Sequence, residues 1–273
     1  MGRIKIATLV VFKNEADILP YWLKCMEKHV DYFLFRDNES TDGSAEIVKA
    51  HPKTVYCDVA KGLFKTSMKD KLFAAAQNSL SDNDWICGGA ADLVPDFNVR
   101  AEIGEVDSKG YTCAKVYFPT FFFTKEMYAR YQADEEYRRS IDNFDPRNYE
   151  FYYNTSNYYE NIIKNTKDPL GRRVRFTRPK QEPPVIPNRN VVATRLCWAH
   201  YRFRSPRQMK ERFEIRNKVY KATRHNKSFR HYSGNWDWKA YLISQSLLHK
   251  YDKGFRSVHR IKMSNLVKAN GRL

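Results

Sequence analysis

The first 95 residues or so alternate between short apolar runs and segments with helical periodicity. A continuous apolar run over residues 4–12 is typical of a parallel strand that is covered on both faces. The next apolar residues recur at spacings of three and four, which predicts a helix with Pro20 in its first turn. Its predicted buried face consists of Ile18, Leu19, Trp22, Leu23 and Met26.

The same alternation continues to the fourth apolar run. Further strands are predicted over residues 32–35, 54–57 and 85–87, with helices over 45–50 and 65–80 between them. Strands that alternate with helices through short connections are typical of a doubly wound α/β sheet. We therefore expect a Rossmann-like, mostly parallel sheet flanked by helices.

The rest of the chain is less regular. Residues 111–123 are rich in β-forming side chains, and the prolines of 179–187 favour a loop or an extended edge. A strand is predicted over 191–198. Ser205, Pro206 and Gln208 together predict a helix start, and that helix should continue to about Arg224. A last helix is predicted over 238–251.

Composition restricts the class of protein. Hydrophobic residues make up 42% of the 273 residues and the mean hydropathy is −0.70, which supports a real core and excludes an integral membrane protein. The first apolar run is too short for a signal peptide, so we expect the chain to stay in the cytoplasm. Its five scattered cysteines contain no Cys-x-x-Cys pair, which argues against a disulfide framework or a zinc site.

Positive charge is concentrated near the end of the chain. The formal net charge is +17, and residues 195–273 carry 20 Lys and Arg against four Asp and Glu. Residues 1–194 carry 28 Lys and Arg against 27 Asp and Glu, so their charges nearly cancel. This distribution predicts a balanced domain over residues 1–200 and a basic, largely helical extension over 201–273 that packs on it. Such a field attracts phosphates, nucleic acid or anionic lipid.

Three polar clusters follow predicted strands. They are Lys13-Asn14-Glu15, the segment from Asp37 to Asp42, and Ala90-Ala91-Asp92. Ligands of open α/β sheets bind at the carboxyl ends of the strands, where such clusters would gather around one crevice. Each cluster can also be explained as a turn or a helix cap, because Asp, Asn and Ser favour both.

The spacing of these clusters resembles family 2 glycosyltransferases with the GT-A fold. The similar segments are Val11–Trp22, Asp37–Gly43 and Asp84–Asp92. The closest resemblance is to the branch whose members read KNE, D.NSTDGT and DWI…DADEF, often followed by His-Tyr-x-x-Lys-Ser. The corresponding later segment is His200–Ser205. The resemblance covers residues 4–100 well, 190–215 moderately and 120–185 only loosely.

The resemblance implies a nucleotide site. In that family the Lys-Asn-Glu loop and the first Asp of the second motif hold the base and ribose, which points to the residues Lys13, Asn14, Glu15, Asp37 and Asn38. Carboxylates are suitable acceptors for ribose hydroxyls and base N–H groups. The implied donor substrate is a nucleotide-diphosphate sugar, and the implied acceptor is a glycan or a lipid-linked molecule.

The resemblance also implies a divalent cation, Mn²⁺ or Mg²⁺, that bridges the two phosphates. Asp92 matches the last Asp of the family's metal element and His200 matches a later histidine, while Arg204 would contact phosphate. The family's first Asp is Ala90 here, and Leu93 replaces its final Glu. Either one carboxylate suffices, or residue 90 was changed from Asp, or the metal site is divergent.

An inverting transfer also needs a base that deprotonates the acceptor hydroxyl. Among the acidic residues of 134–145 we favour Glu135 or Glu136 as the candidate base. The alternative is an exposed acidic helix that offsets neighbouring arginines.

Two other functions stay open. Aromatic and basic residues mix in the C-terminal third, as in nucleic-acid-binding proteins, although no recognisable nucleic-acid motif is present. A nucleotide-sugar-binding protein without catalysis would explain Ala90. The basic helix beginning at Ser205 is either a solvated charged face or a surface that contacts an anionic membrane or a phosphorylated lipid acceptor, and contact with a membrane would make the protein peripheral there.

Overall fold

The computed structural model describes residues 3–64, 67–154, 159–167, 169–175, 185–222, 237–251 and 263–271. The chain divides into two compact units. Unit 1 comprises Met1–Tyr117 and Tyr158–Trp198, and unit 2 comprises Phe118–Asn157 and Ala199–Leu273. The crossing after Trp198 lies close to the boundary predicted at residue 200, whereas the crossing after Tyr117 was not expected from the sequence.

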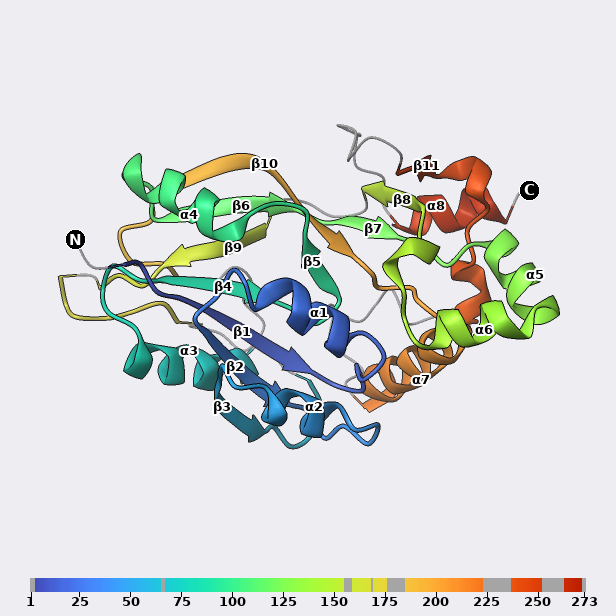
Figure 1. Cartoon of the computed structure of the whole chain (residues 1–273), viewed down its shortest axis with the longest axis horizontal. Helices are drawn as coiled ribbons and strands as arrows, with labels where there is room; N and C mark the ends of the chain where they lie inside the picture. Colours follow the sequence, from blue (N-terminus) through green and yellow to red (C-terminus); the bar gives the residue numbers. More distant parts are fainter. Residues whose placement is uncertain are drawn as a thin grey trace. The chain divides into compact units, whose positions relative to one another are not determined.

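Unit 1 is built on parallel strands with helices between them (Figure 1). Its strands are β1 (Ile6–Phe12), β2 (Tyr32–Asp37), β3 (Thr54–Val59), β4 (Trp85–Gly89), β5 (Leu93–Pro95), β6 (Cys113–Tyr117), β9 (Tyr159–Lys164) and β10 (Val191–His200), the last of which enters unit 2 after Trp198. Its helices are α1 (Leu19–Met26), α2 (Ser44–Ala50), α3 (Met68–Ser79) and α4 (Val99–Ser108).

Strand β1 lies at the centre of the parallel part of this sheet. The strand order through unit 1 is β10-β6-β9-β4-β1-β2-β3. The pairs β1–β2, β1–β4, β2–β3 and β6–β10 are parallel, and β9 runs antiparallel to β4 and β6. The predicted α/β fold with a mostly parallel sheet flanked by helices is therefore confirmed.

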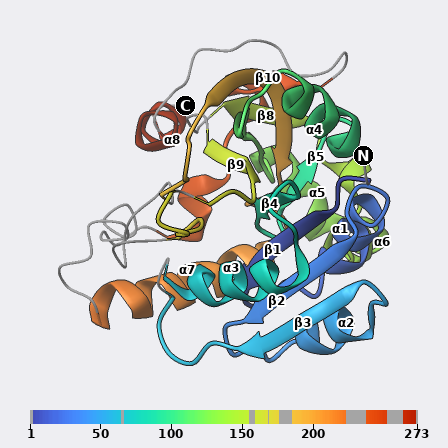
Figure 2. The same cartoon turned by 90° about the vertical axis from the view of Figure 1, so that its left-hand side faces the viewer.

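Helices cover both faces of β2, and each face uses alternate residues of the strand. Trp22 of α1 is fully buried against Phe33 and Phe35, with ring centroids 5.6 and 6.1 Å away. Leu34, which points to the opposite face, belongs to the same buried cluster as Leu72 of α3. Figure 2 shows α1 and α3 on either side of the β1–β2 pair. This two-sided burial explains why these strands read as continuous apolar runs.

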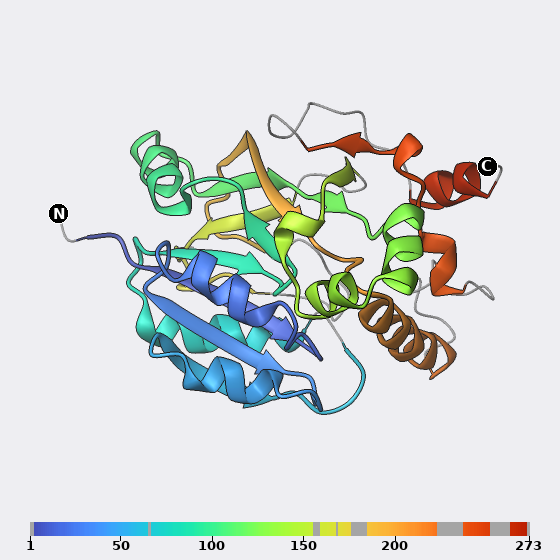
Figure 3. The ribbon, with the colours of Figure 1, turned by 45° about the vertical axis from the view of Figure 1, so that its right-hand side comes forward.

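Unit 2 combines a small sheet with short helices. Its elements are β7 (Pro119–Phe121), α5 (Lys125–Ala133), α6 (Glu135–Asp142), the 3₁₀ turn η1 (Pro146–Asn148), β8 (Phe151–Asn154), α7 (Pro206–Ala222), the 3₁₀ turns η3 (Trp238–Tyr241) and η4 (Gln245–Leu247), β11 (His249–Lys250) and α8 (Met263–Asn270). Helix α7, the long brown ribbon in Figure 3, is its longest element. Stacked aromatic rings form much of the core, including Phe121 on Tyr201 and Phe122 on Phe203.

The sequence predictions for unit 2 were partly confirmed. Helix α7 begins at Pro206 as predicted, and the Ser205 hydroxyl accepts a hydrogen bond from the Gln208 amide at 3.1 Å. The helix predicted over 238–251 was wrong, because that segment contains two 3₁₀ turns and a short strand. The Asn270 side chain bonds the Leu242 carbonyl and the Ser244 amide, groups that a continuous helix would use itself.

The proline-containing segment and the possibility of a membrane-spanning helix were also part of the sequence predictions. Residues 179–184 of the proline-containing segment lie outside the described residues. Among the residues that are described, no helix is both long and apolar enough to cross a membrane.

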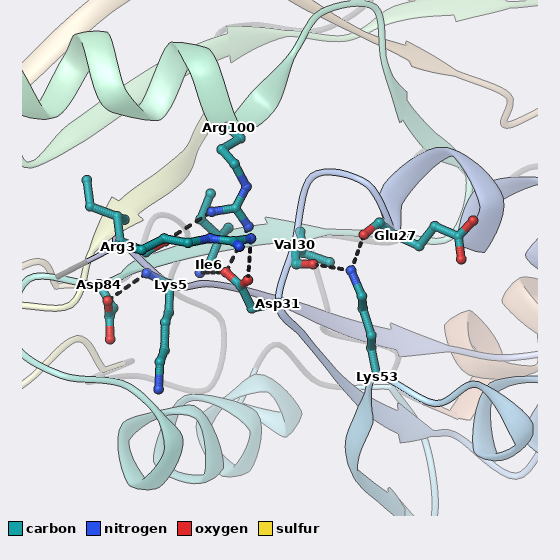
Figure 4. A network of polar contacts seen from close by, with 10 residues as sticks. Arg3, Lys5, Ile6, Glu27, Val30, Asp31, Lys53, Asp84 and Arg100 are labelled. Carbon is teal, nitrogen blue, oxygen red and sulfur yellow. Dashed lines mark hydrogen bonds and ion pairs between the residues drawn. The ribbon is translucent and has the colours of Figure 1, made fainter.

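The amino end of β1 is held by carboxylates from both sides (Figure 4). The Lys5 amide donates to Asp84 and the Ile6 amide donates to Asp31, both at 2.8 Å. Asp31 also accepts a hydrogen bond from Arg100 of α4 at 2.8 Å. Asp31 directly precedes β2 and Asp84 directly precedes β4, so these bonds set the register of β1 against both neighbours.

Replacing Asp31 with Asn should lower the free energy of unfolding by about 1–3 kcal/mol, because a charged acceptor of partly buried donors is lost. Burial alone would raise the pKa of the Asp31 carboxyl, but hydrogen bonds from Arg100 and the Ile6 amide lower it below its ordinary value of 3.8. A lowered folded-state pKa gives stability that is present above the unfolded-state pKa and lost as the pH falls through the folded-state value.

Urea unfolding of both proteins between neutral pH and about pH 3 checks this prediction, and the difference between them should shrink below about pH 4. Glu46→Gln, at an exposed position of α2, serves as the control and should change stability by less than about 0.5 kcal/mol. A difference for Asp31→Asn that persists unchanged at the acidic end would contradict the assigned role of the carboxylate.

Candidate functional site

Three polar loops of unit 1 follow the carboxyl ends of adjacent parallel strands. Phe12 pairs with Asp37 across β1 and β2, and Val10 pairs with Gly89 across β1 and β4. Asn14 comes two residues after β1, Asp37 ends β2, and Asp92 comes three residues after β4. The strand registers thus bring the three predicted clusters to the same edge of the sheet.

The β1–α1 loop is bonded to side chains of the β2–α2 loop. Three consecutive backbone amides donate to three side-chain oxygens, in the pairs Asn14 with Ser40 at 3.0 Å, Glu15 with Ser44 at 2.8 Å, and Ala16 with Asp42 at 2.9 Å. Consecutive amides of this kind often bind anions, but here a neighbouring loop uses them. The polar residues after Asp37 therefore have a structural function.

Further hydrogen bonds, one of them donated by the β2–α2 loop, complete this contact. The Asn14 side-chain oxygen accepts from the Thr41 amide at 2.9 Å. The Lys13 amine donates to the carbonyls of Asn38 and Glu39, at 2.7 and 3.0 Å. Asn14 and Glu39 have φ angles of 51° and 59°, in the left-handed region that Asn tolerates better than Glu. Both loops are thus held in an uncommon backbone conformation by mutual bonds.

The loop after β3 joins the same assembly. The buried Asn38 amide nitrogen donates to the carbonyls of Ala60 and Gly62, both at 2.8 Å. Gly62 in turn donates its backbone amide to the Glu39 carboxylate at 2.9 Å. The Asn38 amide nitrogen therefore bonds to the protein itself, and we refer to these three linked loops, residues 13–16, 37–44 and 60–62, as the loop interlock.

Asp37 differs from the other polar residues of the loop interlock. The residue is 5% exposed, and its Oδ1 accepts from the Ser40 amide at 3.0 Å. No described residue donates a hydrogen bond to the second oxygen, Oδ2. A carboxylate can accept about four hydrogen bonds, and a largely buried one is stabilised by them. Asp37 thus retains acceptor capacity where the strand ends meet.

The loop after β4 forms a tight turn. The Leu93 amide donates to the Ala90 carbonyl at 3.0 Å, and the Leu93 carbonyl accepts from the Trp22 indole of α1 at 2.8 Å. Asp92 within this turn is 2% exposed, whereas Ala90 is half-buried. Across the described part of the chain, no group of three or more His, Cys, Asp and Glu side chains is placed to hold a metal ion.

The other predicted ligands belong to unit 2. His200 ends β10, where its Nδ1 lies 3.3 Å from the Thr120 hydroxyl. Arg204 is fully buried and donates to the Tyr201 carbonyl at 2.9 Å. A phosphate could reach this guanidinium only if its surroundings changed. Asp92 belongs to unit 1, so its predicted pairing with His200 stays a prediction.

Glu135 and Glu136 are exposed in the first turn of α6 in unit 2. Glu135 forms an ion pair with Arg139, four residues later in the same helix. This pairing matches the alternative of an exposed acidic helix. The role of either glutamate as a base stays a prediction.

Trp198 is a residue that the sequence analysis did not connect with this edge. It is fully buried, and a Cβ added to Gly89 would lie 3.6 Å from its ring. The indole Nε1 has no hydrogen-bond partner among the described residues. The consecutive glycines at the end of β4 were the available signal, because glycine in a strand often marks the close approach of another group.

Comparison with known proteins adds little about this site. No protein-family model matches the chain, and no curated protein matches it. One solved structure that is similar over part of its length is a putative glucose-1-phosphate thymidylyltransferase from Bacillus anthracis in complex with a sucrose. The identity is 11% and the TM-score 0.27, over 43% of this chain and 55% of that one. This chain therefore spans about half of that protein, and the likeness is too low to carry an argument about function.

The loop interlock can be tested at Asn14. Asn14→Ala should lower the free energy of unfolding by about 1–3 kcal/mol, since it removes the acceptor of the Thr41 amide and leaves alanine at a left-handed φ. Asn14→Gly removes the same acceptor without the backbone strain, so it should cost less. Urea unfolding of both variants measures the difference, and a glycine variant no more stable than the alanine variant would contradict the strain argument.

Proposed function

We propose that the edge of unit 1 formed by the loop interlock and the β4–β5 turn binds the nucleoside diphosphate of a nucleotide sugar, and that the protein is a glycosyltransferase. The observation that carries this proposal is the Asp37 carboxylate. It lies almost buried where parallel strands end, with one oxygen that receives no hydrogen bond from the described residues.

The position of Asp37 supports a nucleotide rather than another ligand. Open α/β sheets bind nucleotides outside the carboxyl ends of their strands. A carboxylate there can accept a ribose hydroxyl or a base N–H group. The sequence resemblance to family 2 glycosyltransferases assigns the same role to the aspartate at this position. Two independent arguments thus lead to one residue.

The loop interlock supports tight binding through rigidity. Its side chains bond to neighbouring loops, so little conformational entropy is lost when a ligand binds. Under this proposal Asn14, Glu15 and Asn38 act mainly by holding Asp37 in place. Their direct contacts with the nucleotide stay a prediction.

The proposed reaction is a displacement at the anomeric carbon of the donor sugar. The acceptor hydroxyl loses its proton to a base as its oxygen attacks, and the bond between that carbon and the diphosphate oxygen breaks. A nucleoside diphosphate then leaves. Glu135 and Glu136 stay candidates for the base, and the acceptor is a glycan or a lipid-linked molecule.

The β4–β5 turn contains one carboxylate, the buried Asp92, which the resemblance assigns to a divalent cation. One protein oxygen suits Mg²⁺ or Mn²⁺ when the diphosphate and water supply the other ligands. When bound, such an ion would neutralise charge on the leaving diphosphate. Because the protein supplies only one oxygen ligand, we expect most of the ion's ligands to come from the diphosphate and water.

Asp37→Asn tests the proposed contact directly. The asparagine oxygen can still accept from the Ser40 amide, but an NH₂ group replaces Oδ2 and cannot accept a ribose hydroxyl. We expect stability close to that of the original protein and a Kd for the preferred nucleoside diphosphate raised about 10- to 100-fold. Calorimetric titration with UDP, GDP and dTDP in the presence of Mn²⁺ measures this.

The matched control is Asp82→Asn, the same chemical change at an exposed residue before β4, at the opposite edge of the sheet. It should leave nucleotide affinity unchanged. If Asp37→Asn binds every nucleotide as the original protein does, or if the original protein binds none, the proposed site is wrong.

Ala90→Asp tests the metal contribution. If the turn is a family-type metal element that lacks one carboxylate, the second oxygen ligand should strengthen the part of nucleotide binding that depends on Mn²⁺ by about tenfold or more. Ala90→Asn, similar in size but uncharged, should give a much smaller gain. Thermal unfolding with nucleotide, with and without Mn²⁺, compares the two variants. An equal response of both variants would argue against a metal ion at this turn.

A further inference from the structure

Helix α7 of unit 2 presents a basic stripe to solvent. Arg207, Lys210, Lys218 and Lys221 are all exposed, with Glu214 the acidic residue among them. Positions separated by three and four residues lie on one side of a helix, so these side chains share a single face. At about 1.5 Å per residue the stripe extends for about 20 Å.

The lysines of this stripe have no partner among the described residues. Lys210, Lys218 and Lys221 form no hydrogen bond or ion pair with any residue that the structure describes. Glu214 lies four residues from both Lys210 and Lys218, yet it pairs with neither of them. The charge of the stripe is therefore not neutralised by the described residues around it.

The opposite face of α7 fixes the orientation of the stripe. Met209, Phe213 and Val219 are buried in the described structure, and Phe213 contacts the Tyr241 ring at a centroid distance of 4.7 Å. The helix cannot roll over to expose these side chains without breaking the core of unit 2. It can therefore meet a partner only with its charged face, and it has no exposed apolar face to insert.

The amino-acid sequence from the second half of α7 onward is also rich in Lys and Arg. From Ile215 to Trp236 the chain contains six Lys and Arg, two His and no Asp or Glu. Two of those six residues belong to the stripe. The chain from the second half of α7 onward therefore carries no formal negative charge until Asp237.

We propose that the exposed face of α7 docks electrostatically on an anionic lipid bilayer. A straight row of long cationic side chains, set on a helix that cannot insert, matches a broad surface of negative headgroups. The face carries no aromatic residue for stacking on nucleobases, which single-stranded nucleic acids require. A helix that enters a DNA groove must also project from its domain, whereas α7 is half-buried along its length.

This inference does not rest on the proposed nucleotide site. The stripe lies in unit 2, and the loop interlock lies in unit 1. If both are correct, the membrane surface would bring the protein to an acceptor that is linked to lipid.

Co-sedimentation with vesicles tests the proposal on the full chain. The protein should bind vesicles that contain phosphatidylglycerol and phosphatidylcholine, should not bind phosphatidylcholine alone, and should be released at high ionic strength. The triple variant Lys210→Gln, Lys218→Gln, Lys221→Gln should lose binding by about fivefold per lysine, or about a hundredfold in total.

The control removes the same number of charges elsewhere. Lys24→Gln, Lys49→Gln, Lys71→Gln alters three exposed lysines of unit 1 and should keep vesicle binding within about threefold of the original. Thermal unfolding shows whether both triple variants remain folded. The proposal is overturned if the original protein does not bind anionic vesicles, if the α7 variant binds them as well as the control does, or if an oligonucleotide binds while vesicles do not.

Discussion

The register of β1 between its two parallel neighbours is the constraint on which the candidate site depends. Hydrogen bonds from the Lys5 and Ile6 amides to Asp84 and Asp31 fix the strand at its amino end. A shift of β1 by one residue would turn every side chain to the other face of the sheet, which is covered on both sides. The loops at the carboxyl ends of three strands therefore meet because of contacts made at the opposite end.

The polar motif after β2 has one structural function that the hydrogen bonds show and one binding function that we propose. Ser40, Asp42 and Ser44 accept hydrogen bonds from the neighbouring loop, as turn-forming residues would. Asp37 contributes only one of its two oxygens to this assembly. The structural explanation of the motif is therefore confirmed for Ser40, Asp42 and Ser44, and the functional explanation stays a proposal for Asp37. Rigid loops around one available acceptor are what a binding site requires.

The parts of the fold that depend on local pattern could be predicted. Continuous apolar runs indicated β1, β2 and β4, and Ser205 with Pro206 indicated the start of α7. The antiparallel strand β9 could not be predicted, because its placement between β4 and β6 depends on pairing with strands distant in sequence. The same applies to Asn270, whose side chain forms hydrogen bonds with the Ser244 amide and the Leu242 carbonyl, 26 and 28 residues away. These bonds use backbone groups that the helix predicted over 238–251 would need. Local propensity contains no information about such partners.

Burial of charge distinguishes the two kinds of site that we propose for this chain. In unit 1 the proposed contact is made by a largely buried carboxylate, Asp37, which would act at short range on a bound ligand. In α7 the lysines stay in water, where each interaction is weak and screened by salt, so only their number and alignment give an effect. The uneven distribution of charge along the sequence is thus consistent with two different modes of recognition. One depends on the geometry around a particular atom, and the other depends on the sum of many exposed charges.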